Sequence, residues 1–245
     1  MTKGYLQEVF VSFQGEGAYA GRRHLFIRMA GCNLRCRYCD TPDSLARGPH
    51  FRVYYGGRET HDAPNPVSCS GLTPHLARLM ETQAPIDGVA LTGGEPLLQA
   101  AFLAELLRRD ELPRPRLLET GGTLPEELAV VIPWIDSISM DIKIPSNTGE
   151  RPFWDEHTRF LRLARGKVHV KILVDAATLV AEVERAAELV RATASEAPVF
   201  LQPIGDPDGR LDVDQGILWT FYRASRRFVG DVRVLPQVHK TLGVR

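Results

Sequence analysis

Apolar and polar positions beyond residue 72 predict strands and helices that alternate. Apolar runs typical of buried strands occur at residues 88–93, 116–122, 136–143, 167–175, 198–204 and 231–236. The segments between these runs repeat apolar residues at helical spacing, which predicts helices near residues 97–109, 125–132, 153–164, 177–193 and 213–227. This alternation favours a mainly parallel sheet, as in an open barrel or a doubly wound sheet.

The first part of the chain shows short strands before any helix. Val9, Val11 and Phe13 alternate with polar residues, as in a short strand, and residues 24–30 form an apolar run interrupted by Arg28. A charged side chain in a buried strand is costly unless it is paired. Arg28 is therefore expected either to pair with an internal acid or to face a cavity that holds an anionic ligand.

Residues 42–71 are polar, rich in Gly, Pro, Arg and His, and without a clear period. They predict an insertion that forms a flap over the site, with short strands near residues 51–55. A helix signal follows from Leu72, where Thr73 before Pro74 resembles a helix N-cap with proline in the first turn.

Polar and glycine residues stand at the carboxyl ends of five successive predicted strands. In a parallel barrel these ends surround one mouth, which is where such folds place their active sites. We therefore expect a partial (open) TIM-like (β/α)6 barrel with a mostly parallel sheet and the inserted flap. The residues are Thr92-Gly93-Gly94-Glu95, Glu119-Thr120-Gly121-Gly122, Asp141 with Lys143, Lys171 with Asp175, and Gln202-Pro203.

Length and charge narrow the class of protein. The 245 residues, 44% of them hydrophobic, suffice for a single domain spanning residues 1–245. Lys+Arg and Asp+Glu both number 30, so net charge gives no reason to expect nucleic acid or an anionic membrane as a partner. Neither a signal peptide nor an apolar run of about 18 residues is present, so we expect a cytoplasmic protein with reduced thiols.

Three of the four cysteines are clustered. Cys32, Cys36 and Cys39 form a C-x3-C-x2-C spacing, and the adjacent Gly31 and Asn33 suit the curled loop that would bring the thiolates together. Three thiolates are one short of the four that usually hold an iron–sulfur cube. The spacing therefore favours a cluster that leaves one iron open to a small molecule.

Two other readings of the cysteines remain. A disulfide is disfavoured by the expected compartment and by the short loops that it would close. A zinc site would need a fourth ligand, for which Cys69 and His61 are the candidates, but the second ligand pair usual in zinc sites is missing.

The cysteine loop, with Tyr38 before its last cysteine, resembles the signature of the radical S-adenosylmethionine (SAM) superfamily. Gly93-Gly94-Glu95-Pro96 resembles the GGEP motif of that superfamily. Residues 13–41 and 237–245 further resemble the two ends of the 7-carboxy-7-deazaguanine synthase family. The family's tail often ends in proline, whereas Val244 and Arg245 stand here.

The resemblance implies a cofactor set and a reaction. A [4Fe–4S] cluster would bind SAM through its open iron, and one electron would release a 5′-deoxyadenosyl radical that takes a hydrogen from C6 of the substrate. The reaction would convert 6-carboxy-5,6,7,8-tetrahydropterin to 7-carboxy-7-deazaguanine with loss of ammonia, in queuosine biosynthesis, with Mg2+ assisting. An external one-electron donor such as flavodoxin or ferredoxin, and a homodimer, are also implied.

The same resemblance assigns roles by position. Cys32, Cys36 and Cys39 would ligate the cluster, and Thr41 would ligate Mg2+. The substrate would be held by Phe13, Gln14, Gly15, Glu16, Arg28, Thr92 and His239. SAM would be held by Gly94, Glu95, Ser139, Met140, Asp141, Leu201, Gln202 and Pro203.

Two alternative functions fit parts of the pattern. An activase that installs a glycyl radical on a partner protein would share the cysteine loop, but Gln14, Glu16 and Arg28 favour a small substrate. A zinc-stabilised binding module, which would not be an enzyme, leaves the GGEP segment unexplained.

Overall fold

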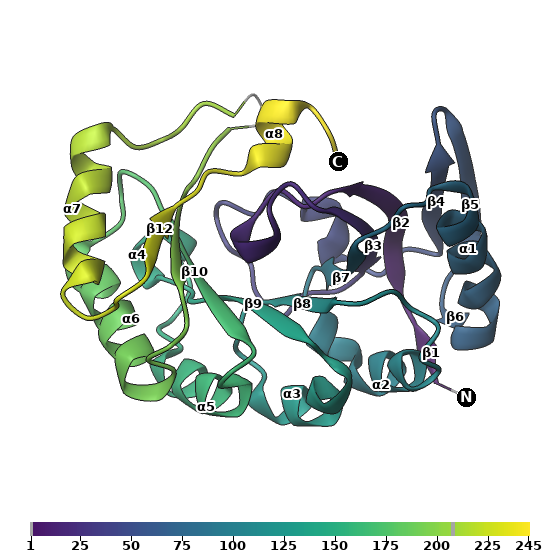
Figure 1. The fold of residues 1–245 in the computed structure, drawn as a ribbon, viewed down its shortest axis with the longest axis horizontal. Coiled ribbons are helices and arrows are strands. Elements are labelled where there is room, and N and C mark those ends of the chain that lie inside the picture. The colour runs from purple at the N-terminus through teal and green to yellow at the C-terminus, as the bar shows by residue number, and fades with distance from the viewer. Residues whose placement is uncertain (1, 207–208) are drawn as a thin grey trace.

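Ten strands form one open sheet in the computed structural model, which describes residues 2–206 and 209–245 (Figure 1). The strands from β12 to β3 run parallel, whereas β2 is antiparallel to β3. The α/β fold with a mostly parallel, open sheet is therefore confirmed. In spatial order the strands are β12 (Val232–Val234), β11 (Val199–Pro203), β10 (Val168–Val174), β9 (Ser137–Asp141), β8 (Arg116–Thr120), β7 (Gly88–Gly93), β3 (Arg23–Met29), β2 (Leu6–Phe13), β4 (His50–Gly56) and β5 (Glu59–Pro64).

Six long helices cover the outer side of this sheet (Figure 1). One helix follows each of β3, β7, β8, β9, β10 and β11, which gives six β–α units in the described part of the chain. The helices are α1 (Cys69–Thr82), α2 (Ala100–Arg108), α3 (Pro125–Val131), α5 (Trp154–Ala164), α6 (Val180–Thr193) and α7 (Gln215–Arg226). The shorter elements are β1 (Lys3–Gly4) paired with β6 (Val67–Ser68), α4 (Pro145–Thr148), α8 (Val238–Leu242), and 3-10 turns at Gly17–Tyr19, Pro42–Leu45, Pro96–Gln99 and Ile132–Trp134.

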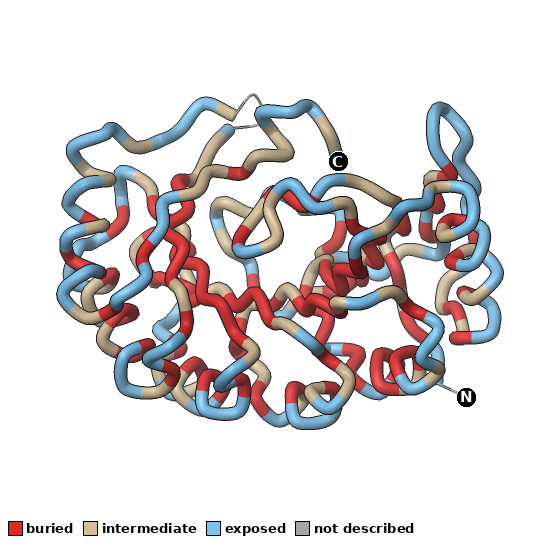
Figure 2. Tube along the Cα trace, viewed as in Figure 1, coloured by how far each residue is buried: buried red, intermediate tan, exposed pale blue. Residues whose placement is uncertain are grey.

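The core lies between the sheet and these helices, where the tube in Figure 2 is mostly red. Strand residues such as Leu91, Val170 and Leu201 are 0% exposed and pack against buried helix residues such as Leu103 and Val190. Burying one such aliphatic side chain contributes about 1.5–3 kcal/mol. Because apolar packing fixes the strands from outside, their polar end residues are free to face the mouth.

Helix α1 begins earlier than predicted, at Cys69, and Ser68 rather than Thr73 is its N-cap. The Ser68 side chain accepts a hydrogen bond from the backbone N–H of Gly71. Pro74 lies inside the helix, and its missing N–H would have bonded to the carbonyl of Ser70, an exposed residue whose carbonyl water can reach. The position of the proline near an exposed helix end explains why it is tolerated.

Residues 42–71 do not form the expected flap over the site. Half of the segment is the β4–β5 hairpin, which extends the edge of the sheet beside β2. Only Leu45, near its start, lines the cavity described below. Among the described residues, no helix combines the length and apolarity that crossing a bilayer requires.

Candidate active site

A cavity of about 400 Å³ lies at the carboxyl ends of the parallel strands. Its lining includes one polar side chain from each of five consecutive strands: Thr92, Glu119, Asp141, Lys171 and Gln202. Each of the five predicted strand ends therefore contributes to one site, although Gly122, Asp175 and Pro203 do not line it.

The cysteine loop and the GGEP segment are joined backbone to backbone. The N–H of Gly94 donates to the carbonyl of Met29 at 3.1 Å, and the N–H of Glu95 donates to that of Gly31 at 2.8 Å. A Cβ atom on Gly94 would lie 2.2 Å from the Gly31 oxygen, and one on Gly93, at φ 131°, would lie 2.2 Å from the Met29 oxygen. The two glycines thus allow β7 to pass against the start of the loop that carries the cysteines.

All three clustered cysteines face the cavity as free, partly exposed thiols. Burial raises the pKa of the Cys32 and Cys36 thiols, so a bound metal would have to drive their deprotonation. Tetrahedral zinc, with Zn–S near 2.3 Å, would hold its sulfurs about 3.8 Å apart. Among the described residues, the three sulfurs do not all lie within 4.8 Å of one another. The loop therefore suits a larger group, such as an iron–sulfur cube, better than one zinc ion.

The proposed fourth zinc ligands do not reach this loop. Cys69 is fully buried at the start of α1, where its Sγ is 3.9 Å from the carbonyl oxygen of Phe102. His61 lies on β5 in the edge hairpin. Neither residue lines the cavity.

The Glu95 carboxylate accepts hydrogen bonds from three neighbouring residues. The donors are the Thr120 hydroxyl at 2.8 and 3.0 Å and the backbone N–H groups of Gly121 and Leu97 at 2.8 and 3.1 Å. Burial raises its pKa, although these donors act in the opposite direction. The carboxylate is thereby fixed in orientation at the cavity wall.

Four charged side chains form a buried chain across the cavity floor. Lys171 forms ion pairs with Glu16 and, at 3.0 Å, with Asp141, whose other oxygen is 2.8 Å from the ammonium of Lys143. Burial alone would raise the pKa of Glu16, but the Lys171 ammonium and further hydrogen bonds lower it to about 2. Burial opposes the charge of Lys171, but Asp141 and Glu16 raise its pKa above the usual value. All four groups are therefore charged at neutral pH.

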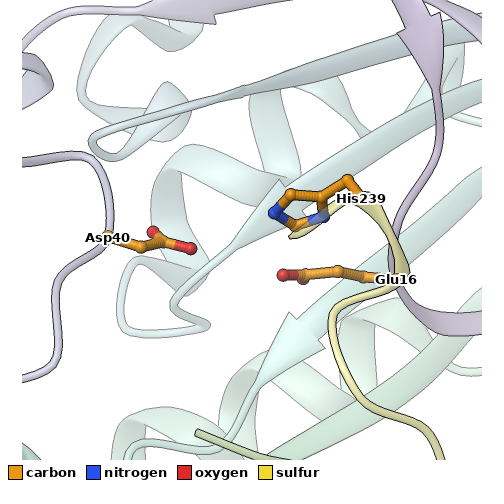
Figure 3. A group of neighbouring side chains, drawn as sticks. All are labelled: Glu16, Asp40 and His239. Atoms are coloured by element: carbon orange, nitrogen blue, oxygen red, sulfur yellow. The ribbon is translucent and has the colours of Figure 1, made fainter. Parts of the chain in front are cut away.

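Glu16 is also linked to the segment that carries α8. The Gln237 amide nitrogen donates to Glu16 and to Asp40, at 2.7 Å in each case. Glu16, Asp40 and His239 each offer one possible ligand atom within 4.8 Å of the others, and all three side chains converge in Figure 3. Thr41, the predicted Mg2+ ligand, follows Asp40 and lines the same cavity.

Gln14 and Thr92 are oriented by Glu119. The Gln14 amide nitrogen donates to one Glu119 oxygen at 2.6 Å, and the Thr92 hydroxyl donates to the other at 2.7 Å. The Gln14 amide oxygen accepts from the N–H of Glu16 at 3.1 Å, which fixes the direction in which the amide points. Burial raises the pKa of Glu119.

Arg28 meets both of the conditions expected from the sequence. Its Nε donates to Glu8 at 2.9 Å, and its side chain, 18% exposed, also lines the cavity. It is therefore a paired strand arginine that still faces the space available to a ligand.

The cavity lining contains most, but not all, of the predicted site residues. All seven predicted substrate residues, the three cysteines and Thr41 belong to it. Of the predicted SAM residues, the lining includes Gly94, Glu95, Asp141 and Gln202 but not Ser139, Met140, Leu201 or Pro203. Neighbouring strand residues point to opposite faces, which places Leu201 and Pro203 away from the side of Gln202.

Many cavity residues were not among the predicted ligand contacts. They include the polar residues Glu8, Glu119, Lys171 and Gln237. Lys171 carries the same signal as Arg28, a charge within an apolar strand, and Glu119 stands at a strand end. Glu8 and Gln237 have no such signal, because their place depends on pairing between distant segments.

The chain resembles known proteins over nearly its whole length. Residues 26–191 match the family model described as the radical SAM superfamily. The chain is 36% identical to the 7-carboxy-7-deazaguanine synthase of Geobacter sulfurreducens, over 97% of this chain and 96% of that one. It is 35% identical to the synthase of Thermococcus kodakarensis, over 98% of each chain.

Solved structures support the fold. The crystal structure of QueE from Escherichia coli matches with a TM-score of 0.58 at 20% identity, covering 97% of this chain and 95% of that one. A radical SAM methyltransferase from Sphaerobacter thermophilus matches with a TM-score of 0.57 at 14% identity, covering 94% and 77%. Together with the cysteine loop and its GGEP partner strand, these similarities show that the chain belongs to the radical SAM superfamily and, within it, to the 7-carboxy-7-deazaguanine synthases.

Proposed function

We propose that the cavity binds 6-carboxy-5,6,7,8-tetrahydropterin and converts it to 7-carboxy-7-deazaguanine with release of ammonia. The observation that carries the proposal is the union, in one cavity, of three cysteine thiols with Arg28 and a set of oriented polar side chains.

Family membership implies a [4Fe–4S] cluster and SAM. Cys32, Cys36 and Cys39 are the residues that would hold the cluster, and Glu95, which lines the same cavity, is the residue that we propose would accept from the amino group of SAM. When bound, the cluster and SAM supply the radical chemistry, while the protein supplies binding and orientation.

The protein's own side chains explain how a carboxypterin would be held. Arg28 offers a charged, planar donor to the substrate carboxylate, which is stronger than a neutral contact. Gln14, with its amide fixed by Glu119, and the carboxylate of Glu16 match the donors and acceptors on the pterin's amide and amine edge. Because Lys171 keeps Glu16 ionised, this edge meets an acceptor at neutral pH.

We also propose a Mg2+ ion beside the substrate carboxylate, with the Thr41 hydroxyl and the neighbouring Asp40 as its oxygen ligands. Mg2+ prefers such ligands and usually retains several waters. Glu16 is assigned to the pterin edge above, so we do not propose it as a ligand of this ion. Activity that survives complete removal of Mg2+ by a chelator would count against this ion.

The electron donor and the assembly follow from the resemblance. We propose an external one-electron donor, such as flavodoxin or ferredoxin, and a homodimer. Turnover supported by purified reduced flavodoxin tests the electron donor. The molar mass of the protein in solution tests the homodimer.

The function is tested by anaerobic incubation of the reconstituted protein with SAM, reductant, Mg2+ and the carboxytetrahydropterin. We expect a product with the ultraviolet spectrum of a deazapurine and one ammonia for each product. Cleavage of SAM without this product, or with a radical found on an added protein, would favour the activase reading instead. Zinc without iron or sulfide in anaerobically purified protein would favour the binding module.

A further inference from the structure

The segment that carries α8 crosses the open side of the sheet. Just after β12, the N–H of Leu235 donates a hydrogen bond to the carbonyl of Leu201 at 3.1 Å. Farther along, the N–H of Val238 donates to the carbonyl of Gly15, in the loop after β2, at 2.9 Å. Figure 1 shows this yellow segment passing from β12 towards β2 and β3. It therefore brings residues from the β12 edge of the open sheet to strands near its other edge.

At the end of this segment, Arg245 pairs with the Glu8 carboxylate, which also pairs with Arg28. The Glu8 carboxylate receives Arg28 on one oxygen at 2.9 Å and Arg245 on the other at 2.6 Å. The Arg245 guanidinium also stacks on the Tyr54 ring, 3.9 Å from its centroid. Glu8, Arg28 and Arg245 all line the cavity.

The net charge of Glu8, Arg28 and Arg245 determines whether this group attracts an anionic ligand. Arg28 and Glu8, 18% and 14% exposed, would alone form a neutral pair with little attraction for an anion. With the Arg245 guanidinium added, the side chains of Glu8, Arg28 and Arg245 together carry one net positive charge. The Arg28 Nε donates to Glu8. Among the described residues, the two terminal nitrogens of the Arg28 guanidinium have no hydrogen-bond partner, so both can donate to a substrate carboxylate.

We propose that Arg245 determines the substrate charge that the cavity accepts: by offsetting Glu8, it leaves the charge of Arg28 available to a carboxylated pterin. This inference rests on the proposed function. Glu8 then acts as a positioning residue for Arg28, and Arg245 acts through Glu8 rather than as a catalytic residue.

The test compares Arg245→Gln with the wild type on two ligands. We expect the KM for the carboxytetrahydropterin to rise about tenfold with kcat within about twofold, as expected for one partly screened charge. The inhibition constant of the uncharged 6-hydroxymethyl analogue should not change. Arg245→Lys should restore most of the affinity, and added salt should reduce the gap between Arg245→Gln and the wild type.

A double variant separates charge from structure. Glu8→Gln/Arg245→Gln restores one net positive charge, and a glutamine oxygen can still accept from Arg28, so the KM should return towards the wild-type value. Arg78→Gln is the matched control, because Arg78 also pairs with a carboxylate at 2.6 Å and stacks 3.9 Å above a tyrosine ring, outside the cavity. It should leave both constants unchanged.

The outcomes separate this inference from the proposed function. Turnover by the wild type tests the function, and the ratio between variant and wild type tests the role of Arg245. Equal weakening of both ligands by Arg245→Gln, no change in KM, or no rescue by the double variant would overturn the inference. If the wild type fails to turn over the carboxypterin, calorimetric binding of the same two ligands to the same variants gives the identical comparison.

Discussion

Replacing Lys171 by methionine should destabilise the protein through the charges it leaves behind. Lys171 is 7% exposed and lies between the carboxylates of Glu16 and Asp141. Methionine fills much of the same space but leaves Glu16 with no cation of its own, while Asp141 keeps Lys143. Removing one partner of a buried ion pair costs more than the pair contributes, because the other charge stays buried.

The pKa of Glu16 gives the direction of this effect. Burial would raise this pKa, but Lys171 and the hydrogen bonds to Glu16 lower it from 4.5 to about 2. Removing one partner of a buried ion pair costs about 3 kcal/mol or more. For a chain of this length the expected fall in Tm is about 6–12 °C.

Thermal unfolding of the wild type and Lys171→Met from pH 8 to pH 4 measures this loss. A carboxylate whose folded pKa is depressed stabilises the protein above its unfolded pKa, and this contribution is lost as the pH falls towards the folded value. For Glu16 that window runs from about pH 4.5 to about pH 2. In the variant, burial without Lys171 raises the folded pKa of Glu16, so the difference in Tm should be largest near pH 8 and narrow as the pH falls.

Two further variants decide whether charge is the cause. Lys167→Met is the matched control, since Lys167 donates only to the carbonyls of Ile132 and Ile135. Lys171→Met/Glu16→Gln removes the buried charge together with its partner and should lose clearly less than the two single variants combined. Losses that add, or a Lys171→Met Tm equal to that of the wild type, would refute the reasoning.

Four other changes test separate parts of the site. Arg28→Ala should raise the KM for the carboxypterin about 10- to 100-fold and leave SAM binding within about twofold, whereas equal loss of both would make Arg28 only a structural partner of Glu8. Cys36→Ala should lack the brown iron–sulfur absorbance after anaerobic reconstitution, and a normal spectrum would remove this ligand assignment. Thr41→Ala should need more Mg2+ for half-maximal turnover, and an unchanged Mg2+ titration would contradict the proposed ligand. Gly93→Ala should lower the free energy of unfolding measured in urea by about 2 kcal/mol or more, since its Cβ would lie 2.2 Å from the Met29 oxygen. An unchanged urea midpoint would show that β7 can shift there.

The sequence predicted the repeating part of the fold because its signals are local. The run at 88–93 coincides with β7, and the run at 198–204 contains β11 with one residue to spare at each end. Residues that are buried on both faces must be apolar throughout, and such runs are visible without knowledge of their neighbours.

The β4–β5 hairpin was harder to predict, because five of the six β5 residues are exposed and the strand carries no apolar alternation. Its partner in the main sheet, β2, precedes the cysteine loop in sequence. A polar segment with weak strand character can be a flap or an edge strand, and only pairing decides between them.

The candidate site also has a part that could be predicted from the sequence and a part that could not. The cysteine loop and the GGEP segment are short motifs, so their residues could be named from the sequence. The pairing of Glu8 with Arg245 and the contact of Gln237 with Glu16 join residues more than 200 positions apart. Such contacts follow from the path of the chain across the open sheet, which no local pattern encodes.

In the proposed site, one cavity holds a carboxypterin against SAM bound to the cluster. Substrate deuterated at C6, incubated with SAM and the anaerobically reconstituted protein, tests this arrangement through mass analysis of the pterin product and of the adenosyl group. Because loss of ammonia accounts for the whole difference in composition between substrate and product, the hydrogen taken from C6 has to be returned during turnover. We expect 7-carboxy-7-deazaguanine, with deuterium from C6 recovered in the adenosyl group of SAM or of 5′-deoxyadenosine. Product formed with no deuterium in the adenosyl group, or SAM cleavage with the pterin recovered unchanged, would contradict the arrangement.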